Sequence, residues 1–578
     1  MFTTIVKMPD HGMINIRPLE RCIRRFQRLG ALAAATLLLA LSPYAVADEK
    51  SEEVSAHILQ AEMALQEHDY QTASIEYRKA AELSDDSDVA QQATRVAYSY
   101  AFNKDALRSA KRWVKLDNDS DEAMLYLAQL NLRVGEIRES RRTFEKLLER
   151  GDEPIDERLL ALIPFLSQED PDKSYELMRQ LAKPYRKSAP ANYAVAVMAL
   201  QSGETDIAKE RAQLAIGFDP EWVKPHLLYA RALLLSGDEE GAIDYTARLV
   251  GDDPDPDPEA RLELAIMLLS AGRDDDALSQ VNQILLEQPA RTDALRLMAI
   301  INFRLEHLDA ARADFEDLLS SGHYTMDALY YLGRIADRRS EHEEAVHFYS
   351  QVTRGSNAVM SQRRAAGIIA QEGDPDKALE HLSEFAEINP TYAVDMLQAK
   401  AQLLASQKRY PEALEYYDQV VSYRPDSEGA YLGKAELLLR MGRLDDAIAQ
   451  YELSVKRWPD SSMSLNAYGY TLADRTDRYK EAARLIKKAL KLEPDSAAII
   501  DSWGWVLYRQ GEYEEALVFL NKAYEKLSDP EVAGHIFEVL WALDRHEEAQ
   551  ATLADAELIF PDNDVLKNIR ERYLPGAP

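Results

Sequence analysis

The sequence is almost free of cysteine. Cys22 is the only one in 578 residues, and it lies among arginines that precede an apolar run near the N-terminus. The chain beyond residue 47 therefore contains no thiol. This absence excludes disulfide bonds, a thiol nucleophile and thiolate zinc sites from that part of the protein.

Long hydrophobic runs are equally scarce, since the one that stands out extends only from Leu29 to Leu41. An arginine-rich segment precedes this run, and an Ala-Val-Ala cleavage pattern follows it before Asp48. The combination predicts a secretory signal peptide over residues 1–47 and an exported mature chain. An uncleaved anchor is the alternative, although an ordinary spanning helix needs about 20 apolar residues.

Positive charge is in short supply, with 68 lysines and arginines against 99 aspartates and glutamates and a net charge of −31. Residues 1–47 carry a net charge of +4, which leaves −35 on residues 48–578. A chain this acidic repels phosphate backbones and anionic lipid surfaces. We therefore expect no nucleic-acid partner.

What the chain does contain is a repeat. The segment 495–530 matches the pattern of a tetratricopeptide repeat, which is a helix, a turn and a second helix in about 34 residues. The matching residues are Trp503, Gly504, Leu507, Gly511, Ala516, Leu520 and Ala523. Small residues at Gly504 and Ala516 let the two helix axes approach to about 8 to 10 Å. One such hairpin cannot bury its own apolar faces, so copies must stack.

The small residue that opens the second helix recurs every 33 to 35 residues along the chain. It is found at Ala73, Ala106, Ser140, Ser174, Ala208, Ala242, Ala277, Ala311, Ala345, Ala378, Ala413, Ala447, Ala482, Ala516 and Ala549. The sequence therefore predicts an all-α tetratricopeptide-repeat superhelical solenoid of about 15 helix-turn-helix repeats.

The regularity of the repeats changes along the chain. Repeats within 54–255 are less regular, and those within 256–561 follow the pattern almost without interruption. Residues 251–258 read GDDPDPDP, which we interpret as a stiff turn between repeats because proline cannot continue a helix. Residues 562–578 are predicted to form a polar capping helix and tail.

No group of residues predicts catalysis, a cofactor or a metal ion. His342 and His347 are five residues apart and miss the i, i+4 spacing that places two ligands on one helix face. Acidic runs such as 274–276 come at the start of second helices, where the helix dipole favours negative charge. We therefore expect a protein that acts through its surface.

The inner surface of such a solenoid is lined by first helices, at positions 15, 11 and 7 residues before the small residue. The first candidate surface there consists of Arg296, Arg304, Tyr330, Arg334, Arg338 and Arg363. Arginine recognises carboxylates in a bidentate manner, which predicts an acidic segment or a C-terminal carboxylate as the ligand. The alternative is that these arginines pair with the chain's own acids, such as Glu306, Asp309 or Asp327.

A second candidate surface lies further along the chain. It consists of Tyr470, Asp501, Trp505, Tyr508 and Arg509. Tryptophan, tyrosine and arginine dominate the energetics of protein interfaces. The alternative is that Trp505 packs between repeats.

The segments 465–490, 499–520 and 529–549 resemble a gammaproteobacterial family of periplasmic tetratricopeptide-repeat proteins, one that includes the lipoprotein adaptor of a carboxyl-terminal processing protease. The resemblance implies a non-enzymatic adaptor that binds a PDZ-type serine protease and presents peptidoglycan hydrolases to it. No cysteine follows the apolar run, so a lipid tether to the membrane is not expected. A scaffold for outer-membrane or exopolysaccharide export machinery is the alternative function.

Overall fold

The computed structural model describes residues 49–67, 69–251 and 256–575. These residues form helices joined by short turns, with no strand among them, so the predicted all-α fold is confirmed. The predicted signal peptide and residues 252–255 of the stiff turn lie outside the described residues. Of the helices described, none combines the length and the apolar character needed to cross a membrane.

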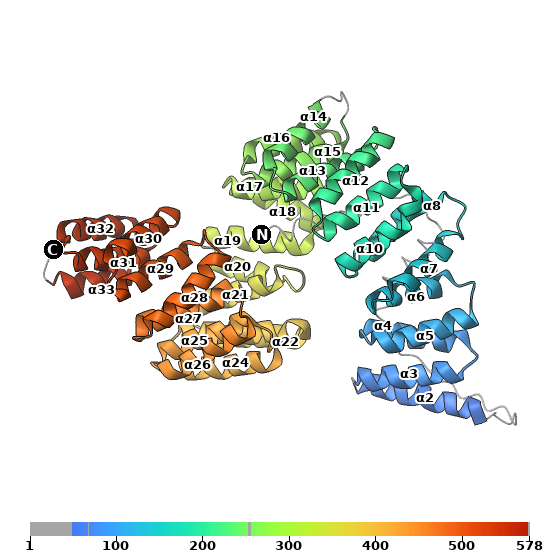
Figure 1. The fold of residues 1–578 in the computed structure, drawn as a ribbon, viewed down its shortest axis with the longest axis horizontal. Helices are drawn as coiled ribbons and strands as arrows, with labels where there is room; N and C mark the ends of the chain where they lie inside the picture. The colour runs from blue at the N-terminus through green and yellow to red at the C-terminus, as the bar shows by residue number, and fades with distance from the viewer. Residues whose placement is uncertain (1–48, 68, 252–255, 576–578) are drawn as a thin grey trace. The chain divides into compact units, whose positions relative to one another are not determined.

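The chain divides into two compact units, residues 1–314 and 315–578. Successive helices in the first unit form antiparallel hairpins, drawn from blue to green in Figure 1. Its α-helices are α2 (Glu49–Gln66), α3 (Tyr70–Leu83), α4 (Ser87–Ser99), α5 (Asn103–Leu116), α6 (Asp121–Arg133), α7 (Ile137–Leu148), α8 (Ile155–Arg158), α9 (Ile163–Leu166), α10 (Pro171–Leu181), α11 (Ala189–Gln201), α12 (Thr205–Phe218), α13 (Val223–Leu235), α14 (Glu239–Gly251), α15 (Pro258–Ser270), α16 (Asp274–Glu287) and α17 (Thr292–Arg304). Short 3-10 helices η2 (Leu159–Leu162) and η3 (Lys183–Tyr185) lie beside α8 to α10.

Helix α18 (Leu308–Ser321) contains the boundary between the units. The second unit continues with α19 (Thr325–Arg338), α20 (His342–Ser350), α21 (Ala358–Gln371), α22 (Pro375–Ile388), η4 (Pro390–Tyr392), α23 (Ala393–Ser406), α24 (Tyr410–Tyr423), α25 (Glu428–Arg440), α26 (Leu444–Arg457), α27 (Ser462–Arg475), α28 (Tyr479–Leu492), α29 (Ala497–Gln510), α30 (Tyr513–Lys526), α31 (Pro530–Ala542), α32 (His546–Ile559) and α33 (Asp564–Tyr573). From α19 onward, each first helix packs on the second helix that follows it.

The small residue used to find the period is buried in every repeat. All fifteen of these alanines and serines have an exposed fraction of 0 or 1%. In repeat 14, a Cβ atom added to Gly504 would lie 2.7 Å from Leu520 Cγ and 3.2 Å from the Ala516 carbonyl oxygen. The close helix crossing predicted at Gly504 and Ala516 is therefore present.

The fourth repeat departs most from the pattern. In place of one continuous first helix it has α8, η2 and α9, which are four residues each. Pro154 precedes α8, and Pro164 stands at the start of α9. Proline lacks the N–H that a helix interior needs, so it fits only at the start of these short segments.

Helix α33 follows the last repeat and packs on α31 and α32. Leu566 and Ile569 are buried against the last repeat, and Asn563 caps the helix by accepting from the Val565 backbone N–H. Arg570 and Arg572 lie in its last turn, where the negative end of the helix dipole favours positive charge. The helix thus closes the apolar end of the stack with a polar outer face.

We predict that Ala516→Leu destabilises the second unit by about 1 to 3 kcal/mol, because the added atoms have no space at the close crossing. Hydrogen exchange should show faster opening of α29 and α30, with the effect fading in more distant repeats. Ala449→Leu is the matched control, since Ala449 is exposed on α26. Equal protection of α29 and α30 in the two variants would contradict the assigned packing.

Candidate functional site

The first helices of the last three repeats, α27, α29 and α31, pack side by side. Small residues let two of these first helices approach the helices that pack behind them. A Cβ atom on Gly469 would lie 2.6 Å from Ile486 Cγ1 of α28, and one on Gly534 would lie 2.6 Å from Ile569 Cδ1 of α33. Each first helix is therefore drawn close to its partner, and its other face is left for polar and aromatic side chains.

A chain of hydrogen bonds crosses this face. The Tyr470 hydroxyl donates to Glu531 at 2.7 Å and lies 3.4 Å from Nε2 of His535. Nδ1 of the same imidazole lies 2.9 Å from Oδ1 of Asp501. Because Tyr470 belongs to repeat 13 and Glu531 to repeat 15, the chain connects repeats that are not neighbours in sequence.

Aromatic rings pack beside this chain. The Trp505 ring stacks on the His535 imidazole with centroids 4.1 Å apart, and Tyr508 lies 4.9 Å from Trp505. Trp505 is only 6% exposed. No acceptor among the described residues lies within hydrogen-bonding distance of its indole N–H, a buried donor that costs about 1 to 3 kcal/mol when unpaired.

His535 is buried among these groups, and burial alone would lower its pKa. The negative charge of Asp501 and the hydrogen bond to it outweigh burial, and Glu531 and Glu538 add to the effect. The pKa of His535 therefore lies above its ordinary value. The imidazole carries a proton in the folded protein at pH values where it would be neutral in the unfolded chain.

The exposed side of the site is acidic. Burial raises the pKa of Glu538, and the nearby charge of Asp474 raises it further against the opposing influence of Arg572 and His535. The Arg572 guanidinium lies 3.5 Å from Glu538 and is mostly exposed. Asp474 pairs with the exposed Arg475 at 2.7 Å, so each of the two carboxylates has one mostly exposed arginine beside it. A partner cation could replace either arginine and reduce the repulsion between the carboxylates.

The structure brings together four residues of the second predicted surface. Asp501 and Trp505 are buried and position their neighbours, while Tyr470 and Tyr508 are half-buried and accessible in part. Arg509 instead donates to the Asp474 carbonyl oxygen at 2.8 Å and to the Tyr479 hydroxyl at 3.0 Å. Trp505 packs between repeats 14 and 15, which was the alternative reading of its role.

The sequence prediction missed three members of the site, Glu531, His535 and Glu538. Glu538 stands 11 residues before Ala549 and was in the predicted register. His535 stands 34 residues after Asp501, one position away from that register because the last spacing is 33 residues. Counting from the first helix instead of the second would have placed it beside Asp501.

The predicted arginine surface spans both compact units, so the convergence of its members stays a prediction. Arg304 donates to the Leu269 carbonyl oxygen at 2.7 Å and pairs with Asp274 at 3.0 Å. The pairing of arginines with the chain's own acids, the alternative interpretation, therefore holds for Arg304, though with a different acid from those expected.

The remaining members of that surface lie as follows. Arg296 is half-buried in the first unit. In the second unit Arg334 lies 5.6 Å from the ring centroids of Tyr330 and Tyr331, whereas Arg338 and Arg363 are exposed. The Tyr330 hydroxyl lies 3.2 Å from Sδ of Met360.

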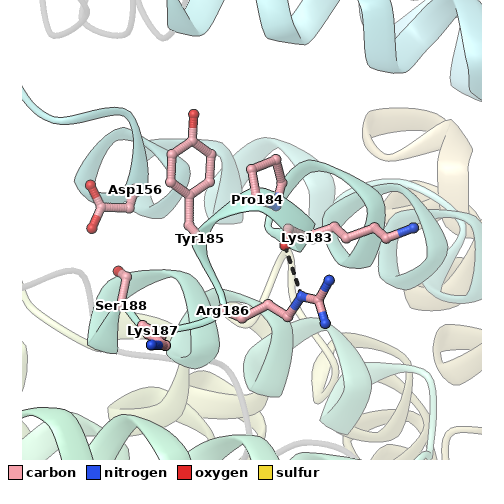
Figure 2. Close-up of a pocket in the computed structure, with 7 residues that line it drawn as sticks. All are labelled: Asp156, Lys183, Pro184, Tyr185, Arg186, Lys187 and Ser188. Carbon is pink, nitrogen blue, oxygen red and sulfur yellow. Dashed lines mark hydrogen bonds between the residues drawn. The ribbon is translucent and has the colours of Figure 1, made fainter.

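A separate hollow is lined by Asp156 and residues 183–188. Figure 2 shows its cationic side chains extending in different directions, with Lys183 pointing away from Lys187. Arg186 Nε donates to the Lys183 carbonyl oxygen at 3.3 Å. Because its charged ends do not converge, we do not assign this hollow a ligand. The part of the chain described here also holds no cluster of three metal-ligating side chains.

Comparison with known proteins identifies the family. Models of the tetratricopeptide repeat match residues 233–301, 297–359, 398–462 and 469–530. The TPR repeat-containing protein PA4667 of Pseudomonas aeruginosa is 30% identical over 492 residues, covering 84% of this chain and 82% of that protein. The chain belongs to the tetratricopeptide-repeat family. The match also extends through the irregular N-terminal repeats, which the repeat models do not reach.

Other tetratricopeptide-repeat proteins are more distant. A tetratricopeptide repeat and J domain-containing co-chaperone of Fusarium oxysporum is 24% identical over 400 residues, covering 58% of this chain and 74% of that protein. The crystal structure of yeast Tom70 covers 90% of this chain and is itself fully covered, at 16% identity and a TM-score of 0.36. Family membership indicates a chain suited to protein–protein interaction.

Proposed function

We propose that this protein is a non-catalytic adaptor that holds a segment of a partner protein against the site on α27, α29 and α31. The observation that carries the proposal is the convergence of Tyr470, Asp501, Trp505, Glu531 and His535 from three successive repeats. Polar and aromatic groups fixed in this way lose little freedom when a partner binds, because they are already ordered.

The charges of the site indicate the kind of segment it holds. Glu531 is exposed, and Glu538 and Asp474 are partly so, with the pKa of Glu538 raised by burial and by the charge of Asp474. A lysine or arginine side chain from the partner would be attracted by these carboxylates and by the ring faces of Tyr508 and Tyr573. A backbone carbonyl of the same segment, admitted by a small movement of Tyr508, would satisfy the indole N–H of Trp505.

We further propose that the adaptor acts in the periplasm and presents cell-wall hydrolases to a carboxyl-terminal processing protease. The signal peptide predicted for residues 1–47 and the resemblance of residues 465–549 to that adaptor family support this role. The bacterial relative named above is compatible with it.

Affinity purification of the mature chain from envelope extracts tests this function. The expected eluate contains the protease and one or more hydrolases, and the Asp474→Lys, Glu538→Lys double variant recovers less of both. Recovery of export machinery instead, equally in the two proteins, would favour the alternative scaffold function and contradict this proposal.

We predict that the exported protein begins at Asp48, because the arginine-rich segment, the short apolar run and the Ala-Val-Ala pattern all agree. Envelope fractionation followed by N-terminal sequencing measures this directly. An intact Met1 in the cytoplasmic fraction would refute both the localisation and the periplasmic part of the proposal.

A further inference from the structure

The outer faces of two second helices, α5 and α28, carry the same arrangement of positive charges. The five positions concerned lie 2 residues before and 2, 5, 6 and 9 residues after the small buried alanine of each helix, so they share one face. We name these faces the α5 strip and the α28 strip. The α5 strip is Lys104, Arg108, Lys111, Arg112 and Lys115, and the α28 strip is Lys480, Arg484, Lys487, Lys488 and Lys491.

This arrangement of charges distinguishes α5 and α28 from the other second helices. Of the second helices that the structure describes, only α5 and α28 have lysine or arginine at all five positions. At the matching positions, each flanking helix of the α28 strip carries two exposed acids and one exposed lysine. These are Asp445, Glu452 and Lys456 on α26 and Glu514, Glu525 and Lys522 on α30. Two helices of an acidic chain therefore share a pattern that its composition does not favour.

Most of these charges are not neutralised within the protein. In the α5 strip, Arg112 pairs with Asp85 at 2.7 Å, and the other four residues are exposed and make no ion pair with the described chain. In the α28 strip, Lys488 pairs with Asp460 at 2.9 Å and Arg484 pairs with Glu481 at 3.9 Å, while Lys487 lies 4.7 Å from the Trp503 ring centroid.

The two ends of the α28 strip, Lys480 and Lys491, are exposed and make no ion pair with described residues. Together with Ala483, the strip lines an open hollow of ≈ 510 Å³. Like charges at i, i+3 and i, i+4 destabilise a helix, so each strip carries a cost that a bound anion would remove.

We propose that the α5 strip and the α28 strip are two equivalent docking sites for acidic segments of partner proteins. From Lys104 to Lys115, and from Lys480 to Lys491, each strip extends about 16 Å along its helix, at 1.5 Å per residue. A segment of about three helical turns with glutamate or aspartate on one face would match that length. This proposal concerns the outer faces of second helices and does not depend on the proposed function of the first-helix site.

At the α28 strip, the flanking charges favour a narrow acidic segment over a membrane surface. Helices packed side by side are about 8 to 10 Å apart, and charges interact over about 10 Å at 0.1 M salt. A flat anionic bilayer placed on the α28 strip would therefore also meet the flanking acids Asp445, Glu452, Glu514 and Glu525, which outnumber the flanking lysines Lys456 and Lys522 and give a net repulsion. A segment lying along α28 alone would avoid them.

Calorimetry with a fluorescein-labelled oligo-glutamate peptide of about twelve residues, the length that spans a strip when helical, tests the proposal. The full mature chain should bind two peptides, with affinity that falls as salt is added. Reversal of three lysines in one strip should leave one binding site, and reversal in both strips should leave none. The α5 variant is Lys104→Glu, Lys111→Glu, Lys115→Glu, and the α28 variant is Lys480→Glu, Lys487→Glu, Lys491→Glu.

The matched control reverses three exposed lysines elsewhere and so changes the net charge equally. It is Lys224→Glu, Lys377→Glu, Lys567→Glu, which should still bind two peptides. Circular dichroism establishes that each variant keeps its helices. Equal weakening in the control and the strip variants would show only a response to net charge and overturn the proposal. Strip-dependent binding of phosphatidylglycerol vesicles, with no binding of the peptide, would overturn it in favour of a membrane.

Discussion

Replacing Asp501 with alanine should destabilise the last three repeats by about 3 to 5 kcal/mol at pH 6, because it leaves a buried imidazole without its counter-ion. Asp501 and His535 are both almost fully buried, with side chains 11% and 9% exposed. Urea unfolding followed by tryptophan fluorescence reports the change, since Trp505 stacks directly on His535.

The pH dependence of this effect follows from the pKa of His535, which is raised in the folded protein. In the wild type the ion pair stabilises the fold fully below the unfolded pKa of about 6.5, and that contribution is lost as pH rises through the folded pKa. In Asp501→Ala only burial and weaker charges act on the imidazole, so protonation now opposes folding. The difference in stability between the two proteins should therefore be larger at pH 6 than at pH 8.

Asp495→Ala is the matched control, because Asp495 pairs with Lys526 at 3.0 Å while its side chain is 85% exposed. Exposed pairs contribute about 0 to 1 kcal/mol, so this variant should differ little from the wild type. A loss as large for Asp495→Ala as for Asp501→Ala, or one independent of pH for Asp501→Ala, would contradict the role given to the buried pair.

Reversing the acidic side of the first-helix site should weaken binding of the purified partner by about 2 to 5 kcal/mol if the charges are desolvated on binding. The variant is Asp474→Lys with Glu538→Lys. Glu538 is largely buried beside Asp474 and has a raised pKa, so a partner cation would meet both carboxylates where water screens them poorly. Calorimetry at two salt concentrations measures the dissociation constant and its dependence on screening.

The control for this experiment is Glu514→Lys with Glu525→Lys, two exposed acids on α30 that change the net charge by the same amount. Binding equal to wild type is expected for the control. If the Asp474→Lys, Glu538→Lys variant keeps its helices and binds with an unchanged dissociation constant, the partner must bind at another surface. The arginine surface that includes Arg334 and Arg338 would then become the first candidate to test.

Sequence periodicity was sufficient to predict the fold because the same physical requirement recurs in each repeat. A small residue must stand where two helices cross, and the residues at all fifteen predicted positions have an exposed fraction of at most 1%. Helix α33 covers the apolar face of the last repeat with Leu566 and Ile569, which meets the same requirement that apolar repeat faces be buried. The broken first helix of the fourth repeat was apparent as irregularity, and its prolines explain it.

The site was predicted only in part from the sequence. The repeat pattern placed all five residues of the second predicted surface on first helices. Four of them, Tyr470, Asp501, Trp505 and Tyr508, do lie together. The same pattern could not show that Arg509 is held by the Asp474 carbonyl oxygen and the Tyr479 hydroxyl. Long polar side chains choose their partners after the backbone is placed, and their sequence spacing does not determine that choice.

The sequence by itself determined the helix pairs, their close crossings and the register that aligns the α5 and α28 strips, because these depend on local periodicity. Only the tertiary structure decided that Tyr470 meets Glu531 across 61 residues and that His535 lies between Asp501 and Trp505. Each repeat adds a small rotation to the one before it, and the sum of those rotations determines which side chains two repeats apart come into contact.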